Sequence, residues 1–306
     1  MYFIERLIEL IREKLSVVCM GLDPRMDKEG EIPKYLIEQY NNPNKVILEF
    51  NKTLIENTHD LIPVIKPQIA FYEKYDALNA LKETIRYAQK KDLLVILDSK
   101  RNDIGTTSKA YADATFEVYK TDACTLNAYL GYDSIKPYLE GYREKGIFIL
   151  LKTSNPSSRE FQDLFSVRMD HLTTSEIEID KDKVKLERNF IQLAKLVLEW
   201  GKELSKFSNY TNLGVVVGAT YPNDLKDIRQ ITKNSFILIP GYGAQGAQAK
   251  DIKFGFNKDG LGGIINSSRS IIYAYHNRKE FGPEKFGEAA RDEIIQMNLE
   301  INKQIN

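Results

Sequence analysis

Eight short apolar runs recur along the chain, and longer amphipathic stretches separate them. Each run is three to five residues long, is mostly β-branched or leucine-rich, and does not alternate with polar residues. Unbroken apolar runs of this kind are typical of strands that are buried on both faces, as in parallel sheets. The runs lie at residues 17–20, 63–65, 93–97, 123–126, 147–151, 213–217, 236–239 and 263–265.

Helical periodicity fills the intervals between these runs. Apolar residues lie on one face over residues 72–90, 104–119 and 189–205, and Leu7, Ile8 and Ile11 share a face of an earlier helix. Strands that alternate with helices predict a (β/α)8 TIM barrel with an extra N-terminal helix. A barrel of this kind accommodates the 306 residues as one domain over residues 1–306. An open doubly wound sheet is the alternative architecture.

One connection is too long for a simple turn. Residues 155–187 are mainly polar, include Pro156, and follow the fifth predicted strand. A long loop in a compact domain is usually functional or disordered, and a loop after a barrel strand rises at the end where active sites lie. We therefore predict a lid that contains some helix of its own.

Composition excludes several classes of protein. Lysine and arginine total 43 and match the 43 acidic residues, so no broad cationic field is available for nucleic acid or an anionic membrane. Cys19 and Cys124 both lie in apolar runs and are expected to be buried thiols, not a disulfide framework. No apolar run approaches membrane-spanning length, and the first residues lack the order of a secretory signal. The histidines and cysteines lack zinc-ligand spacing. These features predict a cytoplasmic protein without a structural zinc site.

Charged residues are concentrated where the third predicted strand ends. Asp98 and Lys100 lie two residues apart, so an extended backbone would direct both side chains into the mouth of the barrel. A lysine between carboxylates keeps its proton and suits an acid or an electrostatic anchor. The alternative is a solvated salt bridge that opens the next helix, with Asp103 near the helix N-terminus.

A second polar group follows strands seven and eight. Gly241, Gly243 and Gly246 allow backbone amides to approach an anion, and Arg269 can add a forked donor. Barrels often bind phosphate with these two loops, although a glycine-rich segment can also be a flexible turn.

Two further charged residues follow strands one and two. Lys66 ends the second strand, where it either enters the site or extends from the rim to solvent. Asp23 precedes a proline and could equally begin a turn.

Together these motifs resemble the orotidine 5'-phosphate decarboxylase family, over about residues 21 to 269. The Asp-x-Lys-x-x-Asp motif at Asp98, Lys100 and Asp103 is the central motif of that family, and Pro-Gly-x-Gly-Ala-Gln-Gly at residues 240–246 is nearly as diagnostic. The Lys-Pro-Gln at Lys66 and the long fifth-strand loop are similar to the larger bacterial branch.

The resemblance implies a reaction without cofactor or metal, in which orotidine 5'-phosphate is decarboxylated to UMP in pyrimidine biosynthesis. Lys66, Asp98, Lys100 and Asp103 would form a charge array, and Lys100 would protonate C6 of the pyrimidine. Asp103 and Thr107 would enter the site from a partner subunit, so the resemblance implies a homodimer.

The resemblance also implies a set of substrate contacts. Asp23 and Lys66 would bind ribose hydroxyls, and Ser154 would contact the pyrimidine. The 5'-phosphate would lie among Pro240, the amides near Gly243, Gln245 and Arg269. Gln68 would also contact the substrate, but it stands where some relatives carry asparagine, which leaves its contact open.

Two alternatives from other classes remain open at this point. The first is a magnesium-dependent sugar-phosphate decarboxylase or aldolase on the same barrel, which would share the Asp-x-Lys-x-x-Asp motif. The second is a non-catalytic nucleotide-binding protein, which would have no need of a proton donor at Lys100.

Overall fold

Eight parallel strands close into a barrel in the order β1-β10-β9-β8-β5-β4-β3-β2. A computed structural model describes residues 1–27, 31–167, 186–243, 246–278 and 280–305 of the chain. Each barrel strand coincides with one of the predicted apolar runs, so the TIM barrel is confirmed and the open sheet is wrong. The strands are β1 (Val18–Leu22), β2 (Val64–Pro67), β3 (Leu94–Arg101), β4 (Ala123–Leu126), β5 (Gly146–Lys152), β8 (Leu213–Val217), β9 (Ile237–Pro240) and β10 (Gly263–Ser267).

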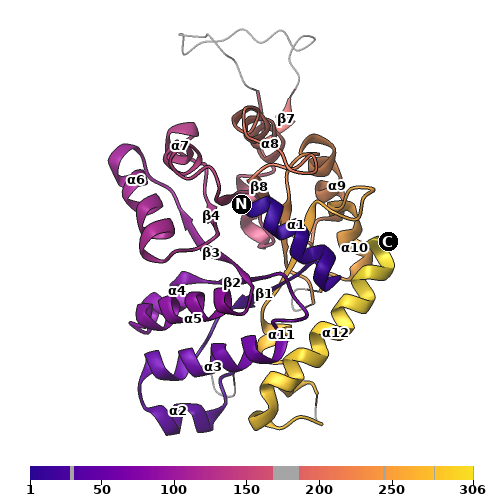
Figure 1. The fold of residues 1–306 in the computed structure, drawn as a ribbon. Coiled ribbons are helices and arrows are strands. Elements are labelled where there is room, and N and C mark those ends of the chain that lie inside the picture. Colours follow the sequence, from indigo (N-terminus) through magenta and orange to yellow (C-terminus); the bar gives the residue numbers. More distant parts are fainter. Residues whose placement is uncertain (28–30, 168–185, 244–245, 279, 306) are drawn as a thin grey trace.

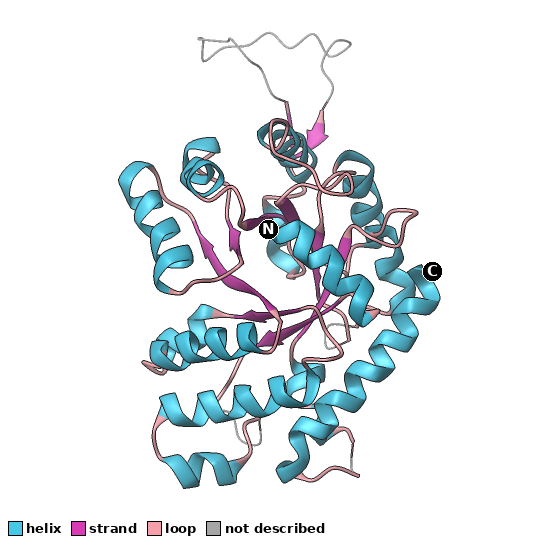
Figure 2. Ribbon diagram, viewed as in Figure 1, coloured by secondary structure: helices cyan, strands magenta, loops and turns pink. Residues whose placement is uncertain are grey.

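Helices surround the strands on the outside of the barrel (Figures 1 and 2). Nearly every residue of the barrel strands is buried, because one face packs into the barrel and the other packs under the helices. The α-helices are α1 (Phe3–Lys14), α2 (Lys34–Tyr40), α3 (Pro43–Thr58), α4 (Ile69–Lys74), α5 (Leu78–Lys90), α6 (Gly105–Asp113), α7 (Tyr132–Gly141), α8 (Asn189–Trp200), α9 (Pro222–Ile231), α10 (Ala249–Ile252), α11 (Arg269–Ile272) and α12 (Phe286–Ile305). Short 3-10 turns are η2 (Pro156–Glu160), η3 (Lys253–Gly255), η4 (Ala274–His276) and η5 (Pro283–Lys285), and η1 (Ala114–Val118) is a π-helical turn.

The predicted helix over 72–90 is wrong in one respect, because two helices occupy this region. Asp76 adopts a left-handed backbone with φ of 50° and separates α4 from α5. The helix predicted over 104–119 is α6 followed by the π-helical turn η1, and α8 ends at Trp200 rather than at 205. These differences lie at helix boundaries, where apolar periodicity carries little information.

The amino-terminal end of the barrel is closed by α1, which confirms the extra N-terminal helix. The ring of Phe3 lies edge-on to that of Phe148 with centroids 6.0 Å apart, and the amide of Ile4 donates to the Asn212 side chain at 2.9 Å. The last helix, α12, packs against α3, where Phe50 and Phe286 stack at 5.1 Å. The amino-terminal end of the barrel is thus covered, and a site is expected at the carboxyl ends of the strands.

The long connection after β5 begins with η2 and continues into a two-stranded antiparallel pair. Its strands are β6 (Phe165–Ser166) and β7 (Glu187–Arg188), and α8 follows directly. The short helical turn agrees with the prediction of some helix in this segment. Residues 168–185 lie outside the described residues, so the predicted lid stays a prediction.

Across the described part of the chain, the helices are all too short or too polar to cross a bilayer.

Candidate functional site

A cavity of about 380 Å³ opens at the carboxyl ends of the strands. Its polar lining combines the charged ends of β2 and β3 with the segment that follows β5. The residues that line it are Lys66, Asp98, Lys100, Thr125, Leu150, Thr153, Ser154, Asn155, Val216, Leu238 and Pro240. Five of the predicted site residues are thus brought together at the position where barrel enzymes carry their chemistry.

A chain of ion pairs connects β2 to β3 inside this cavity. The Lys66 ammonium lies 2.6 Å from Oδ2 of Asp98, and the Lys100 ammonium lies 2.5 Å from Oδ1 of the same carboxylate. The side chains of Lys66 and Asp98 are 5% and 9% exposed, whereas that of Lys100 is 42% exposed. Lys66 and Asp98 are therefore a buried pair, and Lys100 extends from that pair into the accessible part of the cavity.

Electrostatics keeps the buried pair ionised. Burial opposes the charged form of Lys66, but the carboxylates of Asp98 and Asp23 outweigh it and raise the pKa of the ammonium. Burial likewise opposes charge on Asp98, but the ammonium groups of Lys66 and Lys100 outweigh it and lower the pKa of the carboxyl well below its ordinary value. Asp98 is thus a fixed negative charge that faces two cations.

The backbone of Lys100 is not extended, contrary to the prediction. The register of β3 against β4 shifts between Leu97 and Arg101, and Lys100 adopts a left-handed backbone with φ of 50°. This conformation is uncommon for a residue other than glycine, and such outliers cluster at functional sites. The predicted proximity of Asp98 and Lys100 is correct, but a bulge produces it.

Thr125, at the end of β4, supports this bulge and was not predicted. Its hydroxyl donates to Oδ1 of Asp98 at 2.8 Å and accepts from the Lys100 amide at 3.2 Å. One side chain thereby orients the carboxylate and holds the backbone of the lysine. The only signal in the sequence is its place in the fourth strand, which does not distinguish it from a core threonine.

The end of β1 lies beside the same pair, since Gly21 is in register with Lys66 and Asp23 acts electrostatically on the Lys66 ammonium. Oδ1 of Asp23 is buried without a hydrogen-bond partner, which is uncommon for a buried polar atom. Cys19 and Cys124 are buried free thiols, as predicted, and burial raises the pKa of the Cys19 thiol to about 12.

The glycine-rich turn after β9 lies against the start of α11. A methyl group on Gly243 would be 2.7 Å from Oγ of Ser270, so these two loops meet as the phosphate prediction requires. The amides of Gly243 and Gly246 donate within the turn, to Ala247 and Gly243 respectively. Arg269 begins α11 and is exposed, and its side chain has no polar partner among the described residues. Gln245 lies outside the described residues.

Asp23, Gly243 and Arg269 do not line the cavity itself, and the same holds for three other predicted residues. Oδ1 of Asp103 accepts from the adjacent Ile104 amide at 2.9 Å. Thr107 is exposed on α6. Gln68 is the N-cap of α4, where its side chain accepts from the Ala70 amide.

Within the described ranges, no group of three or more histidine, cysteine, aspartate and glutamate residues is arranged to hold a metal ion.

Comparison with known proteins identifies the family. The family model described as orotidine 5'-phosphate decarboxylase / HUMPS family matches residues 16–281. The orotidine 5'-phosphate decarboxylase of Petrotoga mobilis is 40% identical, with 98% of each chain covered, and that of Caldicellulosiruptor saccharolyticus is 38% identical, with 90% of each covered. The solved structure of the Leishmania donovani OMP decarboxylase superimposes with a TM-score of 0.72 at 28% identity, covering 98% of this chain and 99% of the other. The match over nearly the whole chain, on the barrel and cavity described above, places this protein in the orotidine 5'-phosphate decarboxylase / HUMPS family.

Proposed function

We propose that the chain decarboxylates orotidine 5'-phosphate to UMP and that Lys100 is the proton donor. The observation that carries this proposal is the Lys66–Asp98–Lys100 chain of ion pairs in a cavity at the end of the barrel. In the reaction, the bond from C6 to the carboxylate breaks and its electron pair stays on C6. Carbon dioxide leaves, and a proton moves from Nζ of Lys100 to C6. Solvent then returns a proton to the lysine.

The buried pair provides a preorganised field for this step. Asp98 accepts from both lysines and from Thr125, so its carboxylate is fixed before substrate arrives. Lys100 is held beside the position where negative charge develops, and a fixed cation there stabilises the transition state without reorganisation. This arrangement requires no electron sink from a cofactor.

The remaining predicted residues have roles in binding. The unpartnered oxygen of Asp23 is suited to a ribose hydroxyl, together with the buried Lys66. Ser154 lines the cavity and is suited to the pyrimidine edge, while Pro240 lines the side toward the glycine-rich turn. Arg269 would hold the 5'-phosphate with Gly243 and Gln245. Gln68 caps α4, so it would contribute to substrate binding by fixing the position of that helix.

Asp103 and Thr107 would complete the site of a second copy of the chain. Both are accessible at the start of α6, outside the cavity of their own barrel. Exposed apolar side chains lie at Ile104, Tyr129 and Leu130, in two segments that are joined where the Asn102 side chain donates to the Asn127 carbonyl. Such side chains favour burial against a partner. A homodimer in which Asp103 enters the partner's cavity accounts for both observations.

Chain mixing tests the shared site. Lys100→Ala and Asp103→Ala chains should each be nearly inactive alone, and their heterodimer should regain activity because one of its two sites has both residues. Turnover by mixed chains, with heterodimers demonstrated by mass spectrometry, supports the proposal, and inactive heterodimers contradict it.

We also propose that residues 1–306 form one domain. Helices α1 and α12 both lie outside the 16–281 family match, yet both contribute buried residues to the same core as the barrel strands. Limited proteolysis should release neither helix before the barrel is cleaved.

The activity is tested by following the loss of orotidine 5'-phosphate absorbance with a chelator present. Turnover that is unchanged by the chelator supports the proposal. Turnover of a sugar phosphate that is lost with the chelator would instead support a magnesium-dependent member of the same barrel group.

A further inference from the structure

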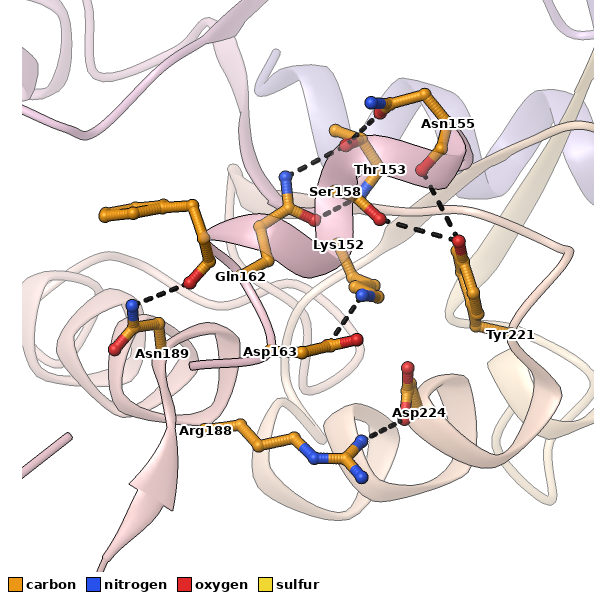
Figure 3. A network of polar contacts seen from close by, with 11 residues as sticks. Lys152, Thr153, Asn155, Ser158, Gln162, Asp163, Arg188, Asn189, Tyr221 and Asp224 are labelled. Carbon is orange, nitrogen blue, oxygen red and sulfur yellow. Dashed lines mark hydrogen bonds and ion pairs between the residues drawn. The ribbon is translucent and has the colours of Figure 1, made fainter. Parts of the chain in front are cut away.

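Two nested, noncovalent cross-links between side chains close the segment after β5 into a loop. In the outer one, Nζ of Lys152 lies 2.6 Å from Oδ1 of Asp163. In the inner one, Gln162 binds Thr153 twice: its Oε1 accepts from the Thr153 amide at 2.9 Å, and its Nε2 donates to the Thr153 hydroxyl at 2.9 Å. Figure 3 shows both contacts, between Lys152 and Asp163 and between Gln162 and Thr153. Ser154 is the next residue after Thr153, so the cross-links close immediately beside a residue that lines the cavity.

The lysine of the outer cross-link is deeply buried and has aromatic support. The Lys152 side chain is fully buried, and its ammonium lies 4.6 Å from the ring centroid of Tyr221 and 5.7 Å from that of Phe190. A buried ammonium is stable only where it is paired, so Asp163 is constrained to stay at this position. The ion pair thus anchors the far end of the segment to the end of β5.

The end of β8 supports the segment from the other side. A methyl group on Gly218 would lie 2.9 Å from both Cα and Cβ of Ser154, so the serine packs directly on that glycine. The Gly218 amide donates to the Lys152 carbonyl at 2.8 Å, and the Tyr221 hydroxyl donates to the Asn155 carbonyl at 3.4 Å. Ser154 is therefore held between β8 and the cross-linked segment.

We infer that Gln162 is a positioning residue that sets the location of Ser154 in the cavity, with the Lys152–Asp163 ion pair as its anchor. The inference rests on the proposed function, because it assigns Ser154 to the substrate ring. Gln162 itself does not line the cavity and acts only through Thr153. Since Ser154 would hold the ring in the ground state and the transition state alike, its displacement should weaken substrate binding more than it slows the chemical step.

The first variant is Gln162→Met, which preserves length and volume but removes both hydrogen bonds to Thr153. We expect KM for orotidine 5'-phosphate to rise about tenfold with little change in kcat, since each lost hydrogen bond is a modest contribution. Gln162→Glu retains an acceptor for the Thr153 amide and should restore part of the loss. The melting temperature of both variants should stay close to that of the wild type, because Thr153 and Gln162 are only half-buried and water can replace the lost contacts.

Gln89→Met is the matched control. Gln89 also fastens a loop with its side chain, donating to the Lys120 carbonyl at 2.8 Å, but it does so near the start of β4 at the other end of the barrel. This control should leave KM unchanged. An equal rise in KM for Gln89→Met would show that any loosened loop weakens binding, and it would overturn the inference.

A double-mutant cycle with Ser154→Ala decides whether Gln162 acts through the serine. If it does, Gln162→Met should have little further effect on KM or on UMP affinity once Ser154 is alanine, because coupled residues are not additive. A full additional tenfold loss in the double variant would overturn the inference. An active wild type whose Gln162→Met variant keeps the wild-type KM would overturn this inference alone. A wild-type chain that leaves orotidine 5'-phosphate intact would overturn the proposed function and this inference together.

Discussion

Replacing Asp98 by asparagine tests how far the buried ion pair determines stability as well as chemistry. The substitution keeps the shape of the side chain and an acceptor for Thr125, but it removes the charge that faces Lys66 and Lys100. Lys66 would be left as a buried ammonium without its hydrogen-bonded carboxylate, and only the Coulombic effect of Asp23 would remain. Breaking a buried pair in this way destabilises a protein by about 3–5 kcal/mol.

This loss of stability can be measured as a fall in the melting temperature. An unfolding entropy of about 2.1 cal/mol/K per residue gives about 0.6 kcal/mol/K for a chain of this length. Asp98→Asn should therefore lower the melting temperature by about 5–8 °C. Glu38→Gln is the control, because it removes one charge of the exposed Lys34–Glu38 pair and should change stability by less than about 1 kcal/mol.

The double variant Lys66→Met/Asp98→Asn isolates the cause of the destabilisation. Methionine fills similar space without charge, so the double variant should regain at least half of the lost melting temperature while it stays inactive. Calorimetry on the wild type, the single variant, the double variant and the control provides the comparison. The reasoning is refuted if the double variant melts at or below the temperature of Asp98→Asn.

Three further predictions follow from the site. The pKa of Asp98 is lowered in the folded state, so its contribution to stability is present above the ordinary value of about 4 and is lost as the pH falls through the lowered pKa. Acid titration of the melting temperature should therefore be less steep for Asp98→Asn than for the wild type, and equal slopes would contradict the assignment. Lys100→Ala should reduce kcat by at least about a thousandfold with an unchanged far-UV circular dichroism spectrum, because the variant lacks the proton donor; wild-type UMP production would exclude Lys100 as the acid. Arg269→Ala should weaken UMP affinity by about tenfold to a hundredfold, since a charge-assisted contact to phosphate is lost; calorimetric titration with unchanged affinity would place the phosphate elsewhere.

The barrel could be predicted from the sequence because its strands are buried on both faces. That burial favours apolar residues at nearly every position of the run, so Leu213–Val217 and Ala123–Leu126 stand out with correct bounds. The break at Asp76 could not be predicted, since apolar spacing continues across it and the left-handed backbone leaves no compositional mark.

The site was predictable to the extent that its residues lie at the carboxyl ends of strands. Lys66, Asp98, Lys100 and Ser154 all do, and all four line the cavity. Gln162 was missed because its partner Thr153 lies nine positions earlier in a polar segment without periodicity. The bulge at Lys100 was missed because it depends on the register between β3 and β4, which is a tertiary property.

The groups proposed for chemistry and those proposed for phosphate binding differ in how the protein holds them. Asp98 is buried and accepts from three donors, on Lys66, Lys100 and Thr125. Arg269, in contrast, is exposed and has no polar partner among the described residues. A group that is fixed before binding contributes to the transition state without reorganisation, whereas a free side chain gains its contacts only when the ligand arrives. Substitution at Lys100 should therefore lower kcat, and substitution at Arg269 should act mainly on affinity, so the two parts of the site separate in steady-state kinetics.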